Sequence, residues 1–217
     1  MTALAATVHD PAGRFFPLLE RHGEALAGYA AVGAVVTSAT NGRVRARLER
    51  CGAVVVPGGE RIGQNRRAAL ATALAAADGD DVLCIDFDRW LFWADTFPDE
   101  LVTLPGRLRR RVPAPWLVSV GRTRRAWRTH PRVQRECEAA TNRVLSLAAG
   151  RSIDATAGCC WLAPEGARRV LAESIEPTNA TDLEWPALML RDRPERFGFV
   201  RVDGLAFETA ALHPDEI

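Results

Sequence analysis

Apolar residues follow two kinds of pattern along the first half of the chain. Short apolar runs, of a length typical of buried strands, occupy residues 4–9, 31–37, 52–56 and 82–85. Stretches with apolar positions at helical spacing occupy residues 15–22, 44–50 and 62–77. Strands that alternate with helices predict a parallel sheet connected by right-handed crossovers.

The pattern is less regular in the second half of the chain. It predicts strands at residues 116–120, 153–162 and 197–202, and helices at residues 133–149, 164–173 and 183–190. In the second of these strands the small residues favour a bulge at Gly158. Because no repeat, low-complexity tract or linker interrupts the chain, we expect one α/β domain over residues 1–217.

Two carboxylates follow the fourth predicted strand directly. The run at 82–85 stops at Asp86, and Asp88 comes one residue later. In open α/β sheets ligands bind just outside the carboxyl ends of such strands. Hard oxygen ligands at that place suit Mg²⁺ or Mn²⁺ bridged to a diphosphate. The alternative interpretation is a solvated loop where a strand reaches the surface.

The composition is that of an ordinary globular protein, with 47% apolar residues, 25% charged residues and a formal charge of +1. No apolar stretch reaches the roughly 18 residues of a membrane span, and the N-terminus lacks the pattern of a signal peptide, so we expect a cytoplasmic location. The five cysteines show no C-x-x-C spacing, and we expect neither a disulfide framework nor a zinc site.

The chain contains no lysine, and all its basic side chains apart from histidine are arginines. This excludes a P-loop lysine, a Schiff base and a lysine general base. Arginine grips phosphate through a bidentate fork, so phosphate binding stays open.

The order of these parts resembles the GT-A class of nucleotide-sugar glycosyltransferases over roughly residues 4–205. Three features carry the resemblance: a first strand ending in Thr7-Val8-His9-Asp10, the helix opening Gly63-Gln64-Asn65-Arg66-Arg67-Ala68-Ala69-Leu70, and Asp86-Phe87-Asp88 after the fourth strand. The resemblance implies a single-domain, GT-A-like (Rossmann-like) mixed and mainly parallel sheet flanked by helices. It places a nucleotide-binding half at about residues 1–95 and an acceptor-side half at about residues 96–217.

The resemblance also implies ligands. A nucleotide-diphosphate sugar would be the donor, and Mn²⁺ or Mg²⁺ would be held by Asp86 and Asp88, with His213 as a third ligand. The residues it assigns to the nucleotide are Thr7, His9, Asp10, Arg66, Arg67 and Asp86. The arginines have a simpler alternative, which is a solvated helix face.

On the acceptor side, the resemblance assigns the general base of an inverting enzyme to Asp182, with Glu184 beside it. The family more often has an acid where this chain has Thr181, and Asp182 has an alternative role as a helix N-cap. Asp154 is a second candidate, placed differently, as a retaining enzyme would require.

Residues 101–135 contain ten arginines and no acid. This local excess of positive charge would attract an anionic acceptor. A nucleic acid would also fit the charge, but no nucleic-acid-binding motif is visible in the chain. The alternative is that these arginines pair with acids elsewhere. Two other functions remain open: a haloacid-dehalogenase-like phosphatase using Asp86 and Asp88, and a non-catalytic nucleotide-binding module of the same fold. The phosphatase family usually has Thr or Val where Arg89 and Trp90 follow here, and uses a lysine that this chain lacks.

Overall fold

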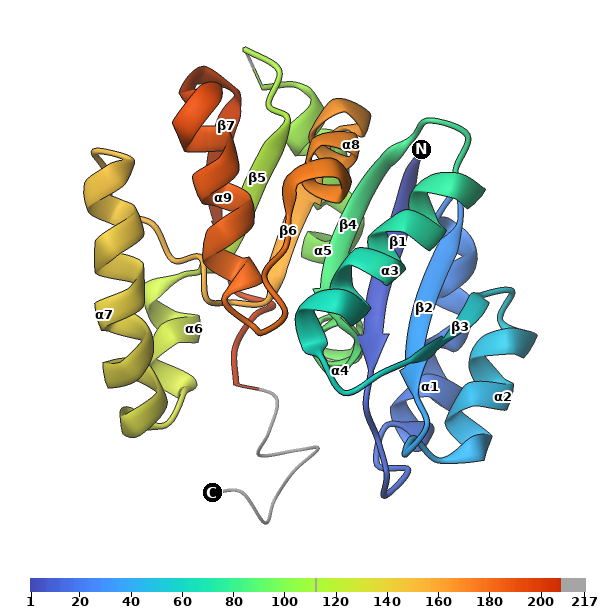
Figure 1. Ribbon diagram of the computed structural model, residues 1–217. Helices are drawn as coiled ribbons and strands as arrows, with labels where there is room; N and C mark the ends of the chain where they lie inside the picture. The colour runs from blue at the N-terminus through green and yellow to red at the C-terminus, as the bar shows by residue number, and fades with distance from the viewer. Residues whose placement is uncertain (112, 208–217) are drawn as a thin grey trace.

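A seven-stranded sheet runs through the computed structural model, which describes residues 1–111 and 113–207. The strands are β1 (Thr2–Val8), β2 (Val32–Thr37), β3 (Val54–Gly58), β4 (Asp81–Asp86), β5 (Leu117–Arg122), β6 (Cys159–Leu162) and β7 (Phe197–Val202). Their order is β3-β2-β1-β4-β6-β5-β7 (Figure 1). Only β6 pairs antiparallel with its neighbours, among the described strands. The predicted mixed, mainly parallel sheet is confirmed.

Helices cover both faces of the sheet. One face carries α1 (Phe16–His22), α2 (Gly42–Arg50), α4 (Phe87–Thr96) and α5 (Pro98–Arg109). The other carries α3 (Ile62–Ala76), α8 (Pro164–Glu173) and α9 (Thr181–Asp192). The helices α6 (Arg124–Thr129) and α7 (Arg132–Ala148) lie beyond β5, and the 3₁₀ turns are η1 (Gly23–Gly28) and η2 (Pro194–Arg196). Within the described ranges, no helix combines the length and the apolarity needed to cross a membrane.

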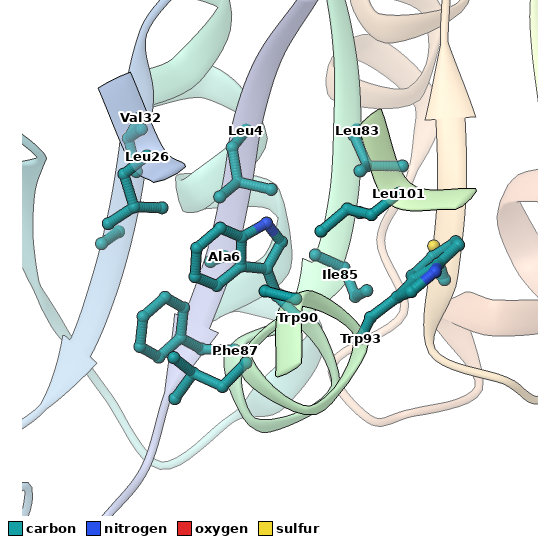
Figure 2. Close-up of a cluster of buried hydrophobic side chains, with 14 of the residues drawn as sticks. Leu4, Ala6, Leu26, Val32, Leu83, Ile85, Phe87, Trp90, Trp93 and Leu101 are labelled. Atoms are coloured by element: carbon teal, nitrogen blue, oxygen red, sulfur yellow. The ribbon is translucent and has the colours of Figure 1, made fainter. Parts of the chain in front are cut away.

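Strand β1 shows how the sequence separates the two cores. Leu4 and Ala6 pack toward α4, whereas Ala3 and Ala5 pack toward α3, as the two-residue period of a strand requires. Figure 2 shows the first core, where Phe87 stacks on Trp90 with ring centroids 5.6 Å apart. Burial of an aromatic side chain such as Phe87 stabilises the fold by about 1.5–3 kcal/mol. This packing fixes the start of α4, and therefore the two aspartates on either side of Phe87.

Three helices were not predicted from the sequence, namely α4, α5 and α6. Helix α4 begins at Phe87, directly after β4, and the two aspartates at its start were interpreted from the sequence as the end of a strand. Helix α5 contains Pro105 in its interior, which sequence rules treat as a breaker.

The strand predicted at residues 153–162 was wrong over its first six residues, because β6 begins only at Cys159. The preceding segment is held by side chains instead. The side chain of Asn142 accepts a hydrogen bond from the backbone amide of Ala155, and the Ser146 hydroxyl accepts one from the amide of Ile153. Gly158 is not a bulge within the strand, but it does adopt a positive φ of 62° just before it.

Candidate active site

A cleft of about 750 Å³ opens at the carboxyl ends of β1 to β4. It is lined by Thr7, Val8, His9, Phe15, Thr37, Ser38, Ala39, Gly58, Gly59, Glu60, Ile62, Asn65, Asp86, Asp88 and Arg89. Carboxyl ends of parallel strands meet at one edge, and the register aligns Thr7 of β1 with Asp86 of β4. The sheet therefore brings the first and third sequence motifs together, as the resemblance implied.

Asp86 is the last residue of β4, and its carboxylate is held by hydrogen bonds. Thr7 Oγ1 donates to Oδ1 at 2.8 Å, and Arg66 Nη2 donates to Oδ2 at 2.9 Å. Burial raises the pKa of this carboxyl, but the charges of Arg66 and Arg89 and these hydrogen bonds outweigh it and lower the pKa below its usual value. Asp86 is therefore ionised at neutral pH.

Asp88 lies in the first turn of α4 and lines the same cleft. Its Oδ1 accepts the backbone amide of Arg89 at 2.8 Å, which orients the carboxylate. The two carboxylates thus converge on one cleft because the chain turns into a helix at Phe87, rather than because a loop follows the strand.

Arg66 of α3 joins Asp86 to the predicted base, Asp182. Its Nη1 donates to Asp182 Oδ1 at 2.8 Å and to Thr181 Oγ1 at 3.1 Å. Asp182 lies in the first turn of α9, and one fifth of its side-chain surface is exposed. Burial raises the pKa of Asp182 to about 6, with the charge of Asp86 adding to it and that of Arg66 opposing it.

Gly158 allows the backbone before β6 to lie close to the Asp86 carboxylate. A Cβ at this position would lie 2.6 Å from Asp86 Oδ2, closer than side chains tolerate. Together with its positive φ, this contact requires glycine. The start of β6 can therefore pass directly beside the Asp86 carboxylate, and Gly158, Asp86 and Asp182 all line one small cavity behind the cleft.

Two of the residues predicted to bind nucleotide lie near the first strand end. His9 lines the cleft, and its Nδ1 lies 2.9 Å from Thr37 Oγ1. Asp10 is 2% exposed, and its two oxygens accept the amides of Arg14 and Phe15 at 2.8 Å. Asp10 therefore shapes the turn after β1, and it is not among the residues that line the cleft.

Arg67 and Glu184 anchor the segment before α9 instead of facing a cavity. Arg67 Nη1 donates to Ser174 Oγ and to the carbonyl of Glu176, at 3.0 and 2.6 Å. Glu184 accepts the amides of Ile175 and Glu176 and the hydroxyl of Ser174. These contacts place α9 relative to α3, so both residues support Asp182 indirectly. His213 falls outside the described residues.

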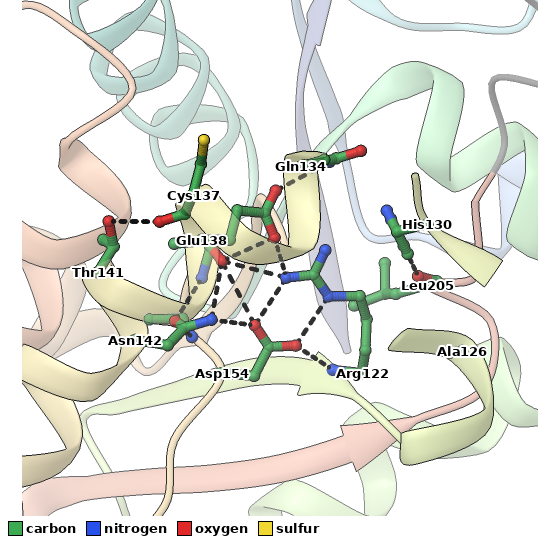
Figure 3. A network of polar contacts seen from close by, with 12 residues as sticks. Arg122, Ala126, His130, Gln134, Cys137, Glu138, Thr141, Asn142, Asp154 and Leu205 are labelled. Atoms are coloured by element: carbon green, nitrogen blue, oxygen red, sulfur yellow. Dashed lines mark hydrogen bonds and ion pairs between the residues drawn. The ribbon is translucent and has the colours of Figure 1, made fainter. Parts of the chain in front are cut away.

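Asp154, the second predicted catalytic acid, belongs to a buried polar network (Figure 3). Its oxygens accept Arg122 Nε and Nη2 at 2.8 and 2.7 Å, and Asn142 Nδ2 at 2.8 Å. Arg122 has no exposed side-chain surface, and it also pairs with Glu138. Burial opposes ionisation, but the hydrogen bonds and charge of Arg122 lower the pKa of Asp154 below its usual value. The network fixes α7 against the end of β5.

Asp154→Asn is expected to lower the free energy of unfolding by about 3–5 kcal/mol, because it leaves the charge of Arg122 buried without its main partner. A carboxyl with a lowered pKa stabilises the fold above its unfolded pKa of about 3.9, and this contribution disappears as pH falls through the folded value. Urea titrations from pH 3 to 7 measure both effects. Glu136→Gln, which removes an exposed pair with Arg132, is the control and should change little.

Two charged or polar residues, Arg89 and Asn65, are among the cleft residues that sequence reasoning missed. Arg89 lines the cleft, with Nε 4.0 Å from Asp86 Oδ2, and it was found only as a departure from the phosphatase motif. Asn65 exchanges two hydrogen bonds of 2.9 Å with the backbone of Gly59, which fixes the loop after β3. The sequence feature that could have revealed Asn65 is the glycine pair Gly58-Gly59 followed by an asparagine in the next predicted helix.

Several arginines of residues 101–135 pair with acids, as the alternative interpretation of that stretch predicted. The pairs are Arg109 with Asp81, Arg122 with Asp154 and Glu138, Arg125 with Asp203, and Arg132 with Glu136. Within the part of the chain that the structure describes, four of the ten arginines in this stretch are therefore neutralised by acids.

The donor set of the cleft fits a cation that keeps part of its hydration shell. Across residues 1–111 and 113–207, no group of three or more His, Cys, Asp or Glu side chains could hold a metal by itself. Asp86 and Asp88 offer two carboxylates on one cleft. Mg²⁺ and Mn²⁺ are commonly bound in this way, by one or two carboxylates together with phosphate oxygens of a substrate.

No family model matches the sequence, and no curated protein matches it either. Solved structures of similar fold include glucosyl-3-phosphoglycerate synthase from Mycobacterium tuberculosis in complex with uridine diphosphate. That match has a TM-score of 0.59 and 16% identity, and it covers 93% of this chain and 69% of that one. The same enzyme with Mn²⁺, UDP-glucose and phosphoglyceric acid matches with a TM-score of 0.58 and 17% identity, over the same shares of the two chains.

The complex of that synthase with Mg²⁺ and uridine diphosphate has a TM-score of 0.57 and 15% identity, again covering 93% and 69% of the two chains. At these identities the similarity shows the fold. The chain has a GT-A-like fold, and the prediction of its fold class is confirmed.

Proposed function

We propose that the chain is a metal-dependent glycosyltransferase that uses a nucleotide-diphosphate sugar. One observation carries the proposal: Asp86, which is ionised, and Asp88 share a cleft of about 750 Å³ at the strand ends, and Arg66 links Asp86 to an acid of raised pKa, Asp182. The similar structures, crystallised with uridine diphosphate and Mn²⁺ or Mg²⁺, support it.

Asp86 and Asp88 would hold the divalent cation, which supplies Lewis-acid stabilisation of the departing diphosphate. The nucleoside would occupy the cleft between the ends of β1 and β3, beside His9 and the loop fixed by Asn65. Arg89 lines this cleft and is placed to donate charge-assisted hydrogen bonds to phosphate oxygens.

In the transfer step, the bond between the sugar's anomeric carbon and the diphosphate oxygen breaks, and a bond to an acceptor hydroxyl oxygen forms. The hydroxyl proton must leave, and Asp182 accepts it in our proposal. A carboxyl of pKa about 6 is mostly ionised at neutral pH, yet is more basic than an ordinary aspartate. Arg66 orients this carboxylate through its hydrogen bond.

In this proposal the first half of the chain, up to about residue 95, binds the nucleotide, and the second half binds the acceptor. All the residues that line the cleft belong to the first half, whereas residues of both halves line the cavity that contains Asp182. An anionic acceptor is consistent with the arginines of residues 101–135 that follow β5, such as exposed Arg124. One of the similar structures contains phosphoglyceric acid, which is such an anion.

A thermal-shift screen of nucleotide sugars with Mn²⁺ is expected to raise Tm for one nucleotide class, and to raise it much less when EDTA replaces the metal. A ligand that binds only the native state stabilises it in proportion to the logarithm of its concentration above Kd. Uridine and guanosine nucleotides at equal concentrations give the comparison between bases.

Release of nucleoside diphosphate from the stabilising donor then separates an enzyme from a non-catalytic binding module. A metal-dependent shift without turnover in the presence of varied hydroxyl acceptors would favour the module. No shift with any nucleotide sugar, together with hydrolysis of phosphate monoesters, would favour the phosphatase alternative.

A further inference from the structure

Helix α7 turns its polar face toward the protein interior and its apolar face toward solvent, which is the reverse of the usual arrangement. Its inner face carries Glu138 and Asn142, which bind the Arg122–Asp154 network, and Leu145 is its only buried apolar residue. A helix at the surface of a monomer normally buries its apolar stripe and exposes its polar one.

The outer face of α7 carries an apolar stripe, which consists of Val133, Cys137, Ala140, Val144 and Leu147. The exposed fractions of its three largest members are 74% for Val133, 68% for Val144 and 75% for Leu147. The spacing alternates between four and three residues, which is the repeat of a helix–helix seam. Figure 1 shows α7 (yellow) at the edge of the molecule, beyond α6 and α9.

This stripe differs from the other exposed apolar residues of the described chain. The other large exposed apolar residues lie on different elements, one on each: Met1 before β1, Val54 on β3, Ile62 on α3, Val102 on α5 and Ile175 after α8. Scattered single residues of this kind are normal on a protein surface. Five consecutive seam positions on one helix, in contrast, are the signature of a docking surface.

We propose that the stripe binds the stripe of a second copy of this chain, with the two helices antiparallel about a two-fold axis near Ala140. In that register Val133 faces Leu147 of the other copy, and Cys137 faces Val144, because both pairs are centred within one residue of Ala140. The small side chain at the centre lets the helices approach closely. The pairing is isologous, as a two-fold dimer requires.

In this register, the charged residues that flank the stripe on one copy are complementary to those on the other copy. Glu136 and Arg143 lie on the same side of the seam, and the antiparallel arrangement brings Glu136 of each copy to Arg143 of the other. Arg143 is exposed and has no ion pair within residues 1–111 and 113–207, whereas Glu136 pairs with Arg132 on its own helix.

A seam of one 17-residue helix from each copy is at the small end of specific interfaces. We therefore expect a reversible dimer with a dissociation constant of roughly micromolar order. Sedimentation velocity of the 217-residue chain over a concentration series is expected to show a monomer–dimer equilibrium. A chain that stays monomeric up to about 100-fold above micromolar concentration would overturn the proposal.

Substitutions at the stripe test its location. Val144→Glu and Leu147→Glu are expected to weaken dimerisation at least tenfold without loss of Tm, because both side chains are mostly exposed in the monomer. Val102→Glu on α5 is the matched control, since Val102 is equally exposed but lies elsewhere. A dimer that survives both α7 variants would show that another surface forms it.

The register is tested by charge exchange and by cross-linking. Arg143→Glu should weaken the dimer, and Arg143→Glu combined with Glu136→Arg should restore it. In a Cys137→Ser background, Ala140→Cys should form an intermolecular disulfide. Native Cys137 should not, because the two copies of this residue would be about 9 Å apart along the axis. Efficient cross-linking through Cys137 itself would overturn the antiparallel register.

Discussion

Replacing Asp88 by Asn is expected to lower the rate of sugar transfer by about 10²- to 10³-fold while leaving the fold intact. The metal contributes several kcal/mol of charge stabilisation to the departing diphosphate, and each 1.4 kcal/mol corresponds to a factor of ten. Asp88 is half-buried and lines the cleft at the start of α4, and its neighbour Phe87 provides the packing, so the substitution removes a proposed ligand without removing core. The measurement is kcat/KM for the donor identified by thermal shift, across a Mn²⁺ titration.

Two further variants test whether the loss of activity comes from the loss of a metal ligand at Asp88. Asp95→Asn changes a carboxylate on the same helix that pairs with Arg21 and His22 away from the cleft, and it should leave the Mn²⁺ dependence unchanged. Asp86→Asn should abolish the same dependence and also lower Tm, because it breaks the pair with Arg66. If Asp88→Asn retains the metal dependence of both binding and transfer, the cation is held elsewhere and the proposed site is wrong.

The sequence was sufficient to place the donor side of the site because its residues follow from strand ends. Thr7, His9, Asp86 and Asp88 each come directly after or at the end of an apolar run, and parallel strands bring such positions to one edge. Arg66 was assigned from the family resemblance, and it lies at this edge because α3 begins there, at Ile62, shortly after the end of β3. Only the position of the two aspartates follows from the period and order of the elements alone.

The acceptor side could not be predicted as well, because side-chain contacts between distant segments decide it. Asp154 and Asp182 were both predicted as catalytic acids. The structure shows that Asp154 is bound by Arg122 and Asn142, whereas Asp182 remains partly exposed beside Arg66. Asp10 and Glu184 likewise bind nearby backbone amides, a use that composition does not reveal. Burial and partners distinguish such acids, and both depend on the complete fold.

Transfer activity is expected to fall as pH decreases through about 6, following protonation of Asp182. The pKa of Asp182 is raised to about 6 chiefly by burial, so the proton-accepting form predominates above that pH and is lost below it. The charged groups facing Asp182 are Arg66 of α3, Asp86 of β4, Arg89 of α4 and Glu138 of α7. The buried thiols of β6 beside it stay protonated, because burial raises the pKa of Cys159 and the Cys84 contact and burial raise that of Cys160.

Asp182→Asn should reduce kcat by about 10²- to 10⁴-fold, the usual contribution of a general base, and should remove the acidic limb of the pH profile of the residual activity. KM for the donor should change much less, because Asp182 does not line the cleft that is proposed to hold the nucleotide. Glu184→Gln on the same helix turn is the comparison: it should lower Tm, through its contacts with Ser174 and Ile175, and keep the acidic limb. An acidic limb that persists in Asp182→Asn would assign the proton transfer to another group, and Asp182 would then only orient Arg66.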